Sequence, residues 1–265
     1  MNITLKAVVV MKIKIKAETG LTISKGRDFS QIGEVDLPVI KDPDGYPFIP
    51  GSSLKGKFRS TYEKLKGKVK DEFNSPSKMP YHICKDPKCP ICSLYGRTSD
   101  ANEKVISEGK GTPIPTMLYF KDFSIDNPER KEPGKFLEVK PENSVDRITS
   151  KANPRFIERV MKGTVFKGEI VLNLYEPSQS ANTLALKEQI EAFEEGFVKI
   201  ISIVETLGIG GHVSRGYGKI SLDLEDALVY INRSAEDKLN INPEPIEAKD
   251  FTELVNELKK KLEIN

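Results

Sequence analysis

The sequence has no tryptophan, only two histidines and three cysteines, and a net charge of just +2 over 265 residues. No apolar run approaches the roughly 18 residues of a transmembrane helix, and the N-terminus has no signal-peptide pattern. With so small a net charge, any site for a polyanion must come from local clusters of basic residues. These features predict a globular cytoplasmic protein that is long enough to bury a substantial core.

The three cysteines all fall within one short stretch, which points away from a framework of disulfides and toward a metal. With one histidine they form the pattern H-x-C-x4-C-x2-C. Three thiolates and an imidazole are the ligands of a closed tetrahedral zinc site, which leaves no position for catalysis. Buried free thiols are the weaker interpretation. We therefore predict a structural zinc ion bound by His82, Cys84, Cys89 and Cys92.

An alternating stretch from Ile3 to Ala17 predicts a long strand with an apolar face and a basic face. A row of lysines on a strand either protects a sheet edge from aggregation or follows the backbone of a nucleic acid. The sequence leaves both open. The residues expected to face inward are Ile3, Leu5, Ala7, Val9, Met11, Ile13, Ile15 and Ala17, and the lysines are Lys6, Lys12, Lys14 and Lys16.

The segment from Gly33 to Ser60 holds a carboxylate, Asp36, in a turn bounded by glycine and proline, followed by a basic helix. Helical periodicity begins at Ser53, and Ser52 or Ser53 is expected to cap the helix. A helix start with free amides, hydroxyls and cations suits a phosphate group. We therefore predict a clamp for a nucleic-acid backbone, made of Ser52, Ser53, Lys55, Lys57 and Arg59.

Two alternatives compete with this clamp. An ordinary capped helix with a solvated basic face has the same composition. A nucleotide-binding P-loop is the other, because Gly51 to Lys57 spells G-x-x-x-x-G-K. The next residue is Phe58, however, where that motif needs a hydroxyl for magnesium, so nucleotide hydrolysis is disfavoured. The alternative for Asp36 is a carboxylate that bonds its own turn.

A second basic segment, Glu142 to Arg159, mixes basic and apolar side chains and is interrupted by Asn153-Pro154. It suits an irregular arm that wedges into a single-stranded nucleic acid, with Arg147 and Arg155 as contacts. A surface hairpin without a ligand is equally compatible with the pattern.

A glycine-rich segment, Gly208 to Gly218, follows the most strongly predicted helix, Asn182 to Leu207, and precedes a strand. Its five glycines would let backbone amides approach a ligand closely or form an anion nest. The candidate contacts are Gly210, Gly211, His212 and Arg215.

Taken together, these segments resemble the repeated backbone subunit of type III-A CRISPR effector (Csm) complexes, among the repeat-associated mysterious proteins (RAMPs). The resemblance extends to about Leu228. The motifs that carry it are ETGL at Glu18 to Leu21, IGEVDLPVIKDPDGYPFIPGSSLKGKFRS at Ile32 to Ser60, SLYG at Ser93 to Gly96, NSVDRITSKANPRFIERV at Asn143 to Val160, and GIGGHVSRGYGKI at Gly208 to Ile220.

The resemblance implies an α+β fold with an RRM-like, ferredoxin-type βαββαβ core in a single domain. The core is expected at about residues 3–65 and 160–230. The expected additions are an insertion at 66–112 that contains a zinc knuckle at 81–96, a thumb arm at about 124–162, and a C-terminal tail helix at 249–263.

The resemblance also implies a function. Copies of such a subunit stack along a CRISPR guide RNA, and the complementary target RNA is cut once per subunit beside Asp36, the position that matches the cleaving aspartate. The expected chemistry is a metal-dependent attack by a 2′-hydroxyl, with Mg²⁺ or another divalent ion. The expected partners are guide RNA, target RNA, other copies of the chain and other Csm subunits, including a capping RAMP subunit.

The sequence departs from the family in one respect that bears on cleavage. Relatives often carry His after Thr-Gly-Leu and a Gly-Gly shortly beyond, whereas Thr22, Ser24 and Lys25 occupy this region here. No role for a histidine in cleavage can be transferred. A non-catalytic scaffold that binds guide RNA is the main alternative function.

Overall fold

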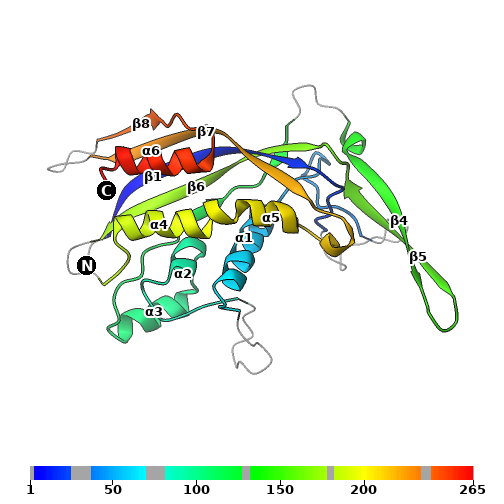
Figure 1. Ribbon diagram of the computed structural model, residues 1–265, viewed down its shortest axis with the longest axis horizontal. Helices are drawn as coiled ribbons and strands as arrows, with labels where there is room; N and C mark the ends of the chain where they lie inside the picture. Colours follow the sequence, from blue (N-terminus) through cyan, green and yellow to red (C-terminus); the bar gives the residue numbers. More distant parts are fainter. Residues whose placement is uncertain are drawn as a thin grey trace.

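The structure is a computed structural model that describes residues 3–24, 37–69, 81–126, 132–177, 182–233 and 240–264. It is a mixed α/β fold with two antiparallel sheets, one of six strands and one of two (Figure 1). None of the helices in these ranges has the length and apolar character that a membrane crossing requires.

The larger sheet is built around β1 (Ile3–Ala17), which pairs antiparallel with β6 (Val165–Pro177) and β7 (Ile220–Asn232). The order across it is β2-β6-β1-β7-β8, and β3 also pairs with β6. Because β1 lies between two partners, its lysines do not protect an edge, and that interpretation is wrong. The remaining strands of the sheet are β2 (Leu118–Phe120), β3 (Ser124–Ile125) and β8 (Ile241–Pro245).

The two faces of β1 have the predicted characters. Its apolar side chains are buried from Ala7 to Ala17, whereas Leu5 is 40% exposed. The register with β6 shifts between Leu5 and Ala7, so the alternation does not continue to the strand's start. On the other face, lysines form cross-strand ion pairs, such as Lys12 with Asp226 at 3.1 Å. Exposed pairs of this kind contribute at most about 1 kcal/mol each.

The apolar face of the sheet is covered by helices, among them α1 (Gly51–Leu65) and α4 (Leu186–Gly196) (Figure 1). Aromatic rings join them. The ring centroid of Phe58 lies 4.8 Å from that of Phe197, which lies 5.4 Å from that of Phe193. All three rings are buried, and a buried aromatic pair contributes about 0.5–1.5 kcal/mol beyond its buried area.

The helix predicted from Asn182 to Leu207 is interrupted. It consists of α4, a 3-10 turn η4 (Val198–Ile200) and α5 (Ile201–Leu207). The break follows Gly196, whose carbonyl accepts a hydrogen bond from the Tyr95 hydroxyl at 2.5 Å. A Cβ at Gly196 would lie 2.4 Å from a Leu94 methyl group, so close packing of this helix on its neighbour requires glycine.

The second basic segment forms a hairpin, and the prediction of an irregular arm is wrong. Strands β4 (Leu137–Val145) and β5 (Ala152–Val160) pair along their length and project from the body of the molecule (Figure 1). Pro154 is tolerated because a two-stranded ribbon leaves one edge of each strand without a ladder partner. A short 3-10 turn, η3 (Pro133–Phe136), leads into the hairpin.

The C-terminal helix α6 (Phe251–Lys261) packs on the chain's own body, where the Phe251 ring meets that of Phe197 at 5.7 Å. Asp250 caps it by accepting hydrogen bonds from the amides of Thr252 and Glu253. The sequence analysis missed strand β8 and helix α3 (Ser99–Ser107). The residues of β8 are largely exposed, so they show no apolar alternation. The helical period of α3 is weak, because its buried apolar side chains are few.

Candidate functional site

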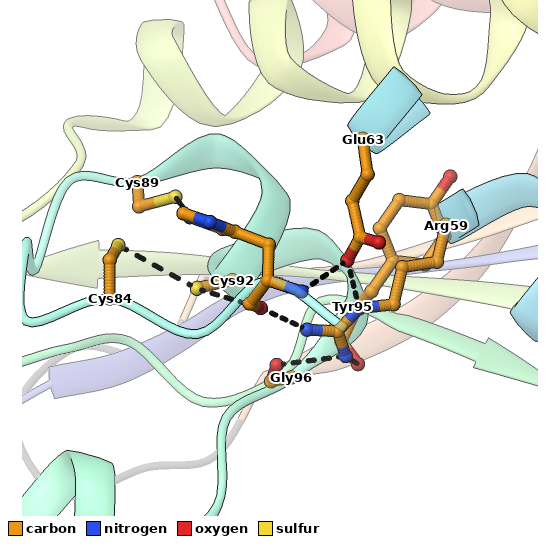
Figure 2. Close-up of polar contacts among 8 residues, drawn as sticks. Arg59, Glu63, Cys84, Cys89, Cys92, Tyr95 and Gly96 are labelled. Atoms are coloured by element: carbon orange, nitrogen blue, oxygen red, sulfur yellow. Dashed lines mark hydrogen bonds and ion pairs between the residues drawn. The ribbon is translucent and has the colours of Figure 1, made fainter. Parts of the chain in front are cut away.

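The four predicted metal ligands converge in one cluster beside α2 (Pro90–Tyr95), where three of them are buried and Cys84 is half-buried. Figure 2 shows the three cysteines of this cluster. The candidate ligand atoms of His82, Cys84, Cys89 and Cys92 all lie within 4.8 Å of one another. Cys92 enters from α2, and the others come from the preceding loop. The four residues of the sequence pattern therefore form one compact group of soft and borderline ligands in the fold.

The spacing of these atoms fits a tetrahedral ion. Bonds of about 2.3 Å to sulfur and 2.0–2.1 Å to nitrogen would place two sulfurs about 3.8 Å apart and a sulfur and nitrogen about 3.5 Å apart. The Sγ atoms of Cys84 and Cys92 are 3.8 Å apart, and Cys89 Sγ lies 3.5 Å from His82 Nε2. The cluster can thus hold a metal ion.

The thiols of the cluster influence each other's ionisation. Hydrogen bonds from Cys89 and Cys92 lower the pKa of Cys84, and Cys84 in turn raises the pKa of Cys89 and Cys92. Metal ligation by cysteine requires the thiolate form, so metal binding to these sulfurs would release protons.

Arg59 belongs to this cluster rather than to the predicted phosphate clamp. Its guanidinium donates to the carbonyl oxygens of His82, Tyr95 and Gly96 and to the carboxylate of Glu63 (Figure 2). Its side chain is only 12% exposed. The guanidinium predicted to contact a phosphate is therefore bonded to groups of the chain itself.

The start of α1 also differs from the prediction. The helix begins at Gly51 with Pro50 as its N-cap, and neither serine caps it with its side chain. The amide of Gly51 donates to the Asp122 carboxylate at 2.8 Å, so an internal anion already lies at the helix start. This arrangement further disfavours the P-loop interpretation, which needs the same amides for a nucleotide.

The other predicted clamp residues lie on the surface of α1. Ser52 is exposed, whereas Ser53, Lys55 and Lys57 are half-buried. Partial burial lowers the pKa of both lysines, with further contributions from Arg59 to the first and Lys64 to the second. Among the residues that the structure describes, neither lysine forms an ion pair.

The glycine-rich loop packs against the chain's own backbone. The amide of Gly211 donates to the Thr22 carbonyl at 2.8 Å, and that of Gly218 donates to the Gly20 carbonyl at 2.9 Å. Gly210 has a φ of +79°, and a Cβ there would lie 2.3 Å from the Thr22 oxygen. The close approach that requires glycine is therefore internal, and the Gly211 amide is not available as part of an anion nest.

The glycine-rich loop and the hairpin meet at Glu142. Its carboxylate accepts a hydrogen bond from the Tyr217 hydroxyl at 2.7 Å and forms an ion pair with Arg215 at 3.2 Å. A pocket of about 300 Å³ opens beside these groups. The residues that line this pocket, called the hairpin junction below, are Glu142, Asn143, Ser144, Arg155 and Arg215.

Two predicted nucleic-acid contacts, Arg155 and Arg215, therefore share one pocket. Arg147 lies apart from them, exposed in the turn of the hairpin. His212 has a left-handed backbone, with a φ of +58°, and its ring lies 5.6 Å from that of Tyr217. Burial and the Glu142 hydrogen bond raise the pKa of Tyr217 to about 12.

The predicted catalytic residue, Asp36, lies outside the described residues. The residues that follow it are attached to the base of the hairpin. Leu37 bridges Ile157, and the amide of Val39 donates to the Glu158 carboxylate at 2.8 Å. Lys41 forms an ion pair with the same carboxylate at 2.9 Å.

Sequence reasoning missed the acidic residues that organise these regions. Glu63, Asp122, Glu142 and Glu158 each bond a backbone or cationic group that lies far away in the sequence. No local pattern marks them, because their partners are set by the tertiary fold. The i, i+4 spacing of Arg59 and Glu63 is the one signal that could have found a pair.

Comparison with known proteins identifies the family. The model of the RAMP superfamily matches residues 14–221, which is more than half of the chain. Three similar relatives carry the name CRISPR system Cms endoribonuclease Csm3. That of Methanocaldococcus jannaschii is 35% identical, covering 98% of this chain and 96% of its own. Those of Streptococcus thermophilus and Methanothermobacter thermautotrophicus are 32% and 35% identical, covering 79% and 78% of this chain and 84% and 80% of their own. The chain therefore belongs to the RAMP superfamily and, within it, to the Csm3 family of CRISPR-system endoribonucleases.

Proposed function

We propose that this chain is the backbone subunit of a type III-A CRISPR effector complex, where it binds guide RNA and cleaves complementary target RNA at regular intervals. The observation that carries the proposal is the attachment at the hairpin base. Leu37, the residue after Asp36 in the sequence, bridges β5 of a projecting hairpin on which Arg147, Lys151 and Arg155 are exposed. Such an arrangement supports a cleaving carboxylate beside an element that distorts RNA.

The hairpin suits the role of the expected thumb. Ile148 in its turn is 94% exposed and Phe156 on β5 is 50% exposed, which is unusual for side chains of this size. Arg147 and Arg155 directly precede these two residues in the sequence, and no ion pair within the described ranges involves either arginine. An apolar wedge beside free guanidinium groups fits between splayed bases while the cations contact phosphates.

The RNA backbone would be contacted along α1, the hairpin and the glycine-rich loop. Arg59 is left out of this set because its guanidinium is bonded at the metal cluster, and Gly211 is left out because its amide bonds Thr22. The proposed contacts are Ser52, Ser53, Lys55, Lys57, Arg147, Arg155, Gly210, His212 and Arg215.

The proposed cleavage is an in-line attack by the target's own 2′-hydroxyl on the adjacent phosphorus. The bond to the 5′-oxygen breaks and this oxygen takes a proton from solvent, leaving a 2′,3′-cyclic phosphate and a free 5′-hydroxyl. Splaying the nucleotide supplies the alignment, from which most of the acceleration comes. Asp36 would accept the hydroxyl proton or hold a divalent ion such as Mg²⁺, which would stabilise charge at the phosphoryl oxygens.

We further propose that the core is RRM-like. Strands β2, β6, β1 and β7 lie side by side in that order, with α1 and the α4–α5 region in the two crossovers. This order supports a ferredoxin-type βαββαβ core within one domain. The segment at 66–112, which contains the metal cluster, and the thumb at about 124–162 would then be insertions into it.

The metal in the cluster is proposed to be a structural zinc ion. Three sulfurs and one nitrogen at tetrahedral spacing suit Zn²⁺, and four protein ligands leave no position for substrate. The ion would hold the loop of residues 81–89 against α2. It would take no part in cleavage.

An assembled complex incubated with end-labelled complementary RNA and Mg²⁺ tests the proposed function. Regularly spaced, metal-dependent fragments are expected. RNA that stays intact while remaining bound would instead establish the non-catalytic scaffold. The partners expected in the complex are other copies of this chain, a capping RAMP subunit and further Csm subunits.

A further inference from the structure

The backbone of His82 is hydrogen-bonded at both its amide and its carbonyl group, independently of the imidazole ring. Its backbone amide donates to Glu63 Oε1 at 3.1 Å, and its carbonyl oxygen accepts from an Arg59 nitrogen at 2.6 Å. Arg59 Nε donates to the same Glu63 oxygen at 2.8 Å. A single ion pair on α1 therefore bonds both the amide and the carbonyl group of His82.

The same guanidinium reaches the other half of the ligand set. It donates to the carbonyl oxygens of Tyr95 and Gly96 at 3.4 and 3.3 Å, where α2 ends. This helix carries Cys92. Arg59 thus joins the loop that supplies His82 to the helix that supplies Cys92, and its guanidinium also lies 4.4 Å from the centroid of the Tyr81 ring.

The pair is almost enclosed, with 12% of the Arg59 side chain and 7% of the Glu63 side chain exposed. Burying two charges gives little net stability compared with apolar side chains of the same size. In contrast, groups outside the ligand set that hydrogen-bond the ligand residues orient those ligands and strongly affect metal affinity. The geometry around His82 matches that second role.

We propose that Arg59 and Glu63 are positioning residues of the metal site, which hold His82 and α2 in the ligand geometry and make the site continuous with α1. The inference rests on the metal site proposed above. Through this pair, an ion in the cluster would also steady the helix that carries Lys55 and Lys57.

Zinc affinity of the purified full-length chain tests the proposal. Wild type, Glu63→Gln and Arg59→Met are titrated with Zn²⁺ in competition with a chromophoric chelator. Both variants are expected to bind about 10- to 100-fold more weakly than wild type. Lys64→Met, at an exposed position of the same helix, is matched to Arg59→Met in charge and should keep wild-type affinity.

Two further measurements distinguish orientation of the metal ligands from a contribution of the pair to the stability of the fold alone. The visible spectrum of the cobalt-substituted chain should change in the variants, because it depends on ligand geometry. Thermal unfolding with and without chelator should show a smaller loss of stability in the metal-free form. Equal losses in both forms, with unchanged zinc affinity, would overturn the proposal.

The outcomes also distinguish this inference from the metal site itself. If wild type and Glu63→Gln each bind one zinc ion with the same affinity, the metal site stands and the proposed role of the Arg59–Glu63 pair is overturned. Wild type that binds no zinc overturns both. If Arg59→Met does not fold, Glu63→Gln decides, because it keeps the size of the side chain and one acceptor oxygen.

Discussion

The metal cluster and the hairpin junction both contain residues that were predicted to bind a ligand, but the polar groups of the two regions differ in how far they are bonded within the chain. At the cluster, ligands and surrounding groups bond to one another, and the Arg59–Glu63 pair is nearly enclosed. At the hairpin junction, Arg155 and Arg215 are exposed beside an open pocket. In a closed site, the type and spacing of the ligand atoms define which ion can bind. In an open site, the binding partner supplies part of the contacts and excludes the water.

This difference explains why the sequence indicates the kind of ligand at the metal cluster but not at the hairpin junction. Four soft and borderline ligands at tetrahedral spacing select a narrow class of ions. Exposed guanidinium groups bind many polyanions, and each contributes little binding free energy until a partner excludes water from the ion pair.

Removing a cluster ligand should have the largest effect on the fold. Cys92→Ser is expected to lose the metal and several kcal/mol of unfolding free energy, because metal binding is coupled to folding. Lowering the pH should release metal from the wild type too, since protons compete for the thiolates. Metal content and thermal unfolding measure both effects. Arg147→Ser in the hairpin turn is the control and should retain metal.

Asp36→Ala should abolish target cutting while leaving the fold and RNA binding intact. A positioned proton acceptor contributes about 10²–10⁴-fold to rate, so a loss of that size is expected. Single-turnover cleavage in the assembled complex measures it, with guide and target binding assayed in parallel. Failure of the variant to assemble would instead assign Asp36 a structural role.

Glu142→Gln should loosen the hairpin junction. Loss of a charged acceptor for Tyr217 is expected to cost about 1–3 kcal/mol of stability. It should also lower the tyrosine pKa from about 12, although burial will keep it above its ordinary value near 10. Because the raised pKa belongs to the folded state, wild type should lose this contribution as pH rises from about 10 to about 12. NMR titration of Tyr217 checks the shift, with Glu103→Gln on α3 as control.

Lys55→Ala and Lys57→Ala should have the smallest effects. Each is expected to reduce the log–log salt dependence of RNA binding by about 0.7, whatever the RNA sequence, because one phosphate contact is lost. Binding titrations over a range of salt concentrations measure the slope. Lys104→Ala, exposed on α3, should leave it unchanged, and an altered sequence preference at constant slope would contradict a backbone contact.

Much of the fold could be predicted because it follows from local periodicity. The strand at Ile3–Ala17 and the buried side chains of α4 are set by alternation and by helical spacing. The break after Gly196 and the exposure of Leu5 could not be foreseen, since each depends on a neighbour far away in the sequence. The internal hydrogen bonds of Arg59 could not be foreseen for the same reason, because a basic residue near a helix start gives no sign of which carbonyl groups it will reach.

Ligand spacing and side-chain alternation are local properties, so the four candidate metal ligands, the central strand with its two faces and the family of the chain could all be read from the sequence. The packing of distant elements was needed to show that Arg59 bonds the loop and helix of the candidate metal cluster, that the glycine-rich loop closes on residues 20–22, and that Arg155 and Arg215 share a pocket. Hydrogen bonds and ion pairs across long stretches of chain depend on how separate elements pack, and no pattern within one element encodes the partner.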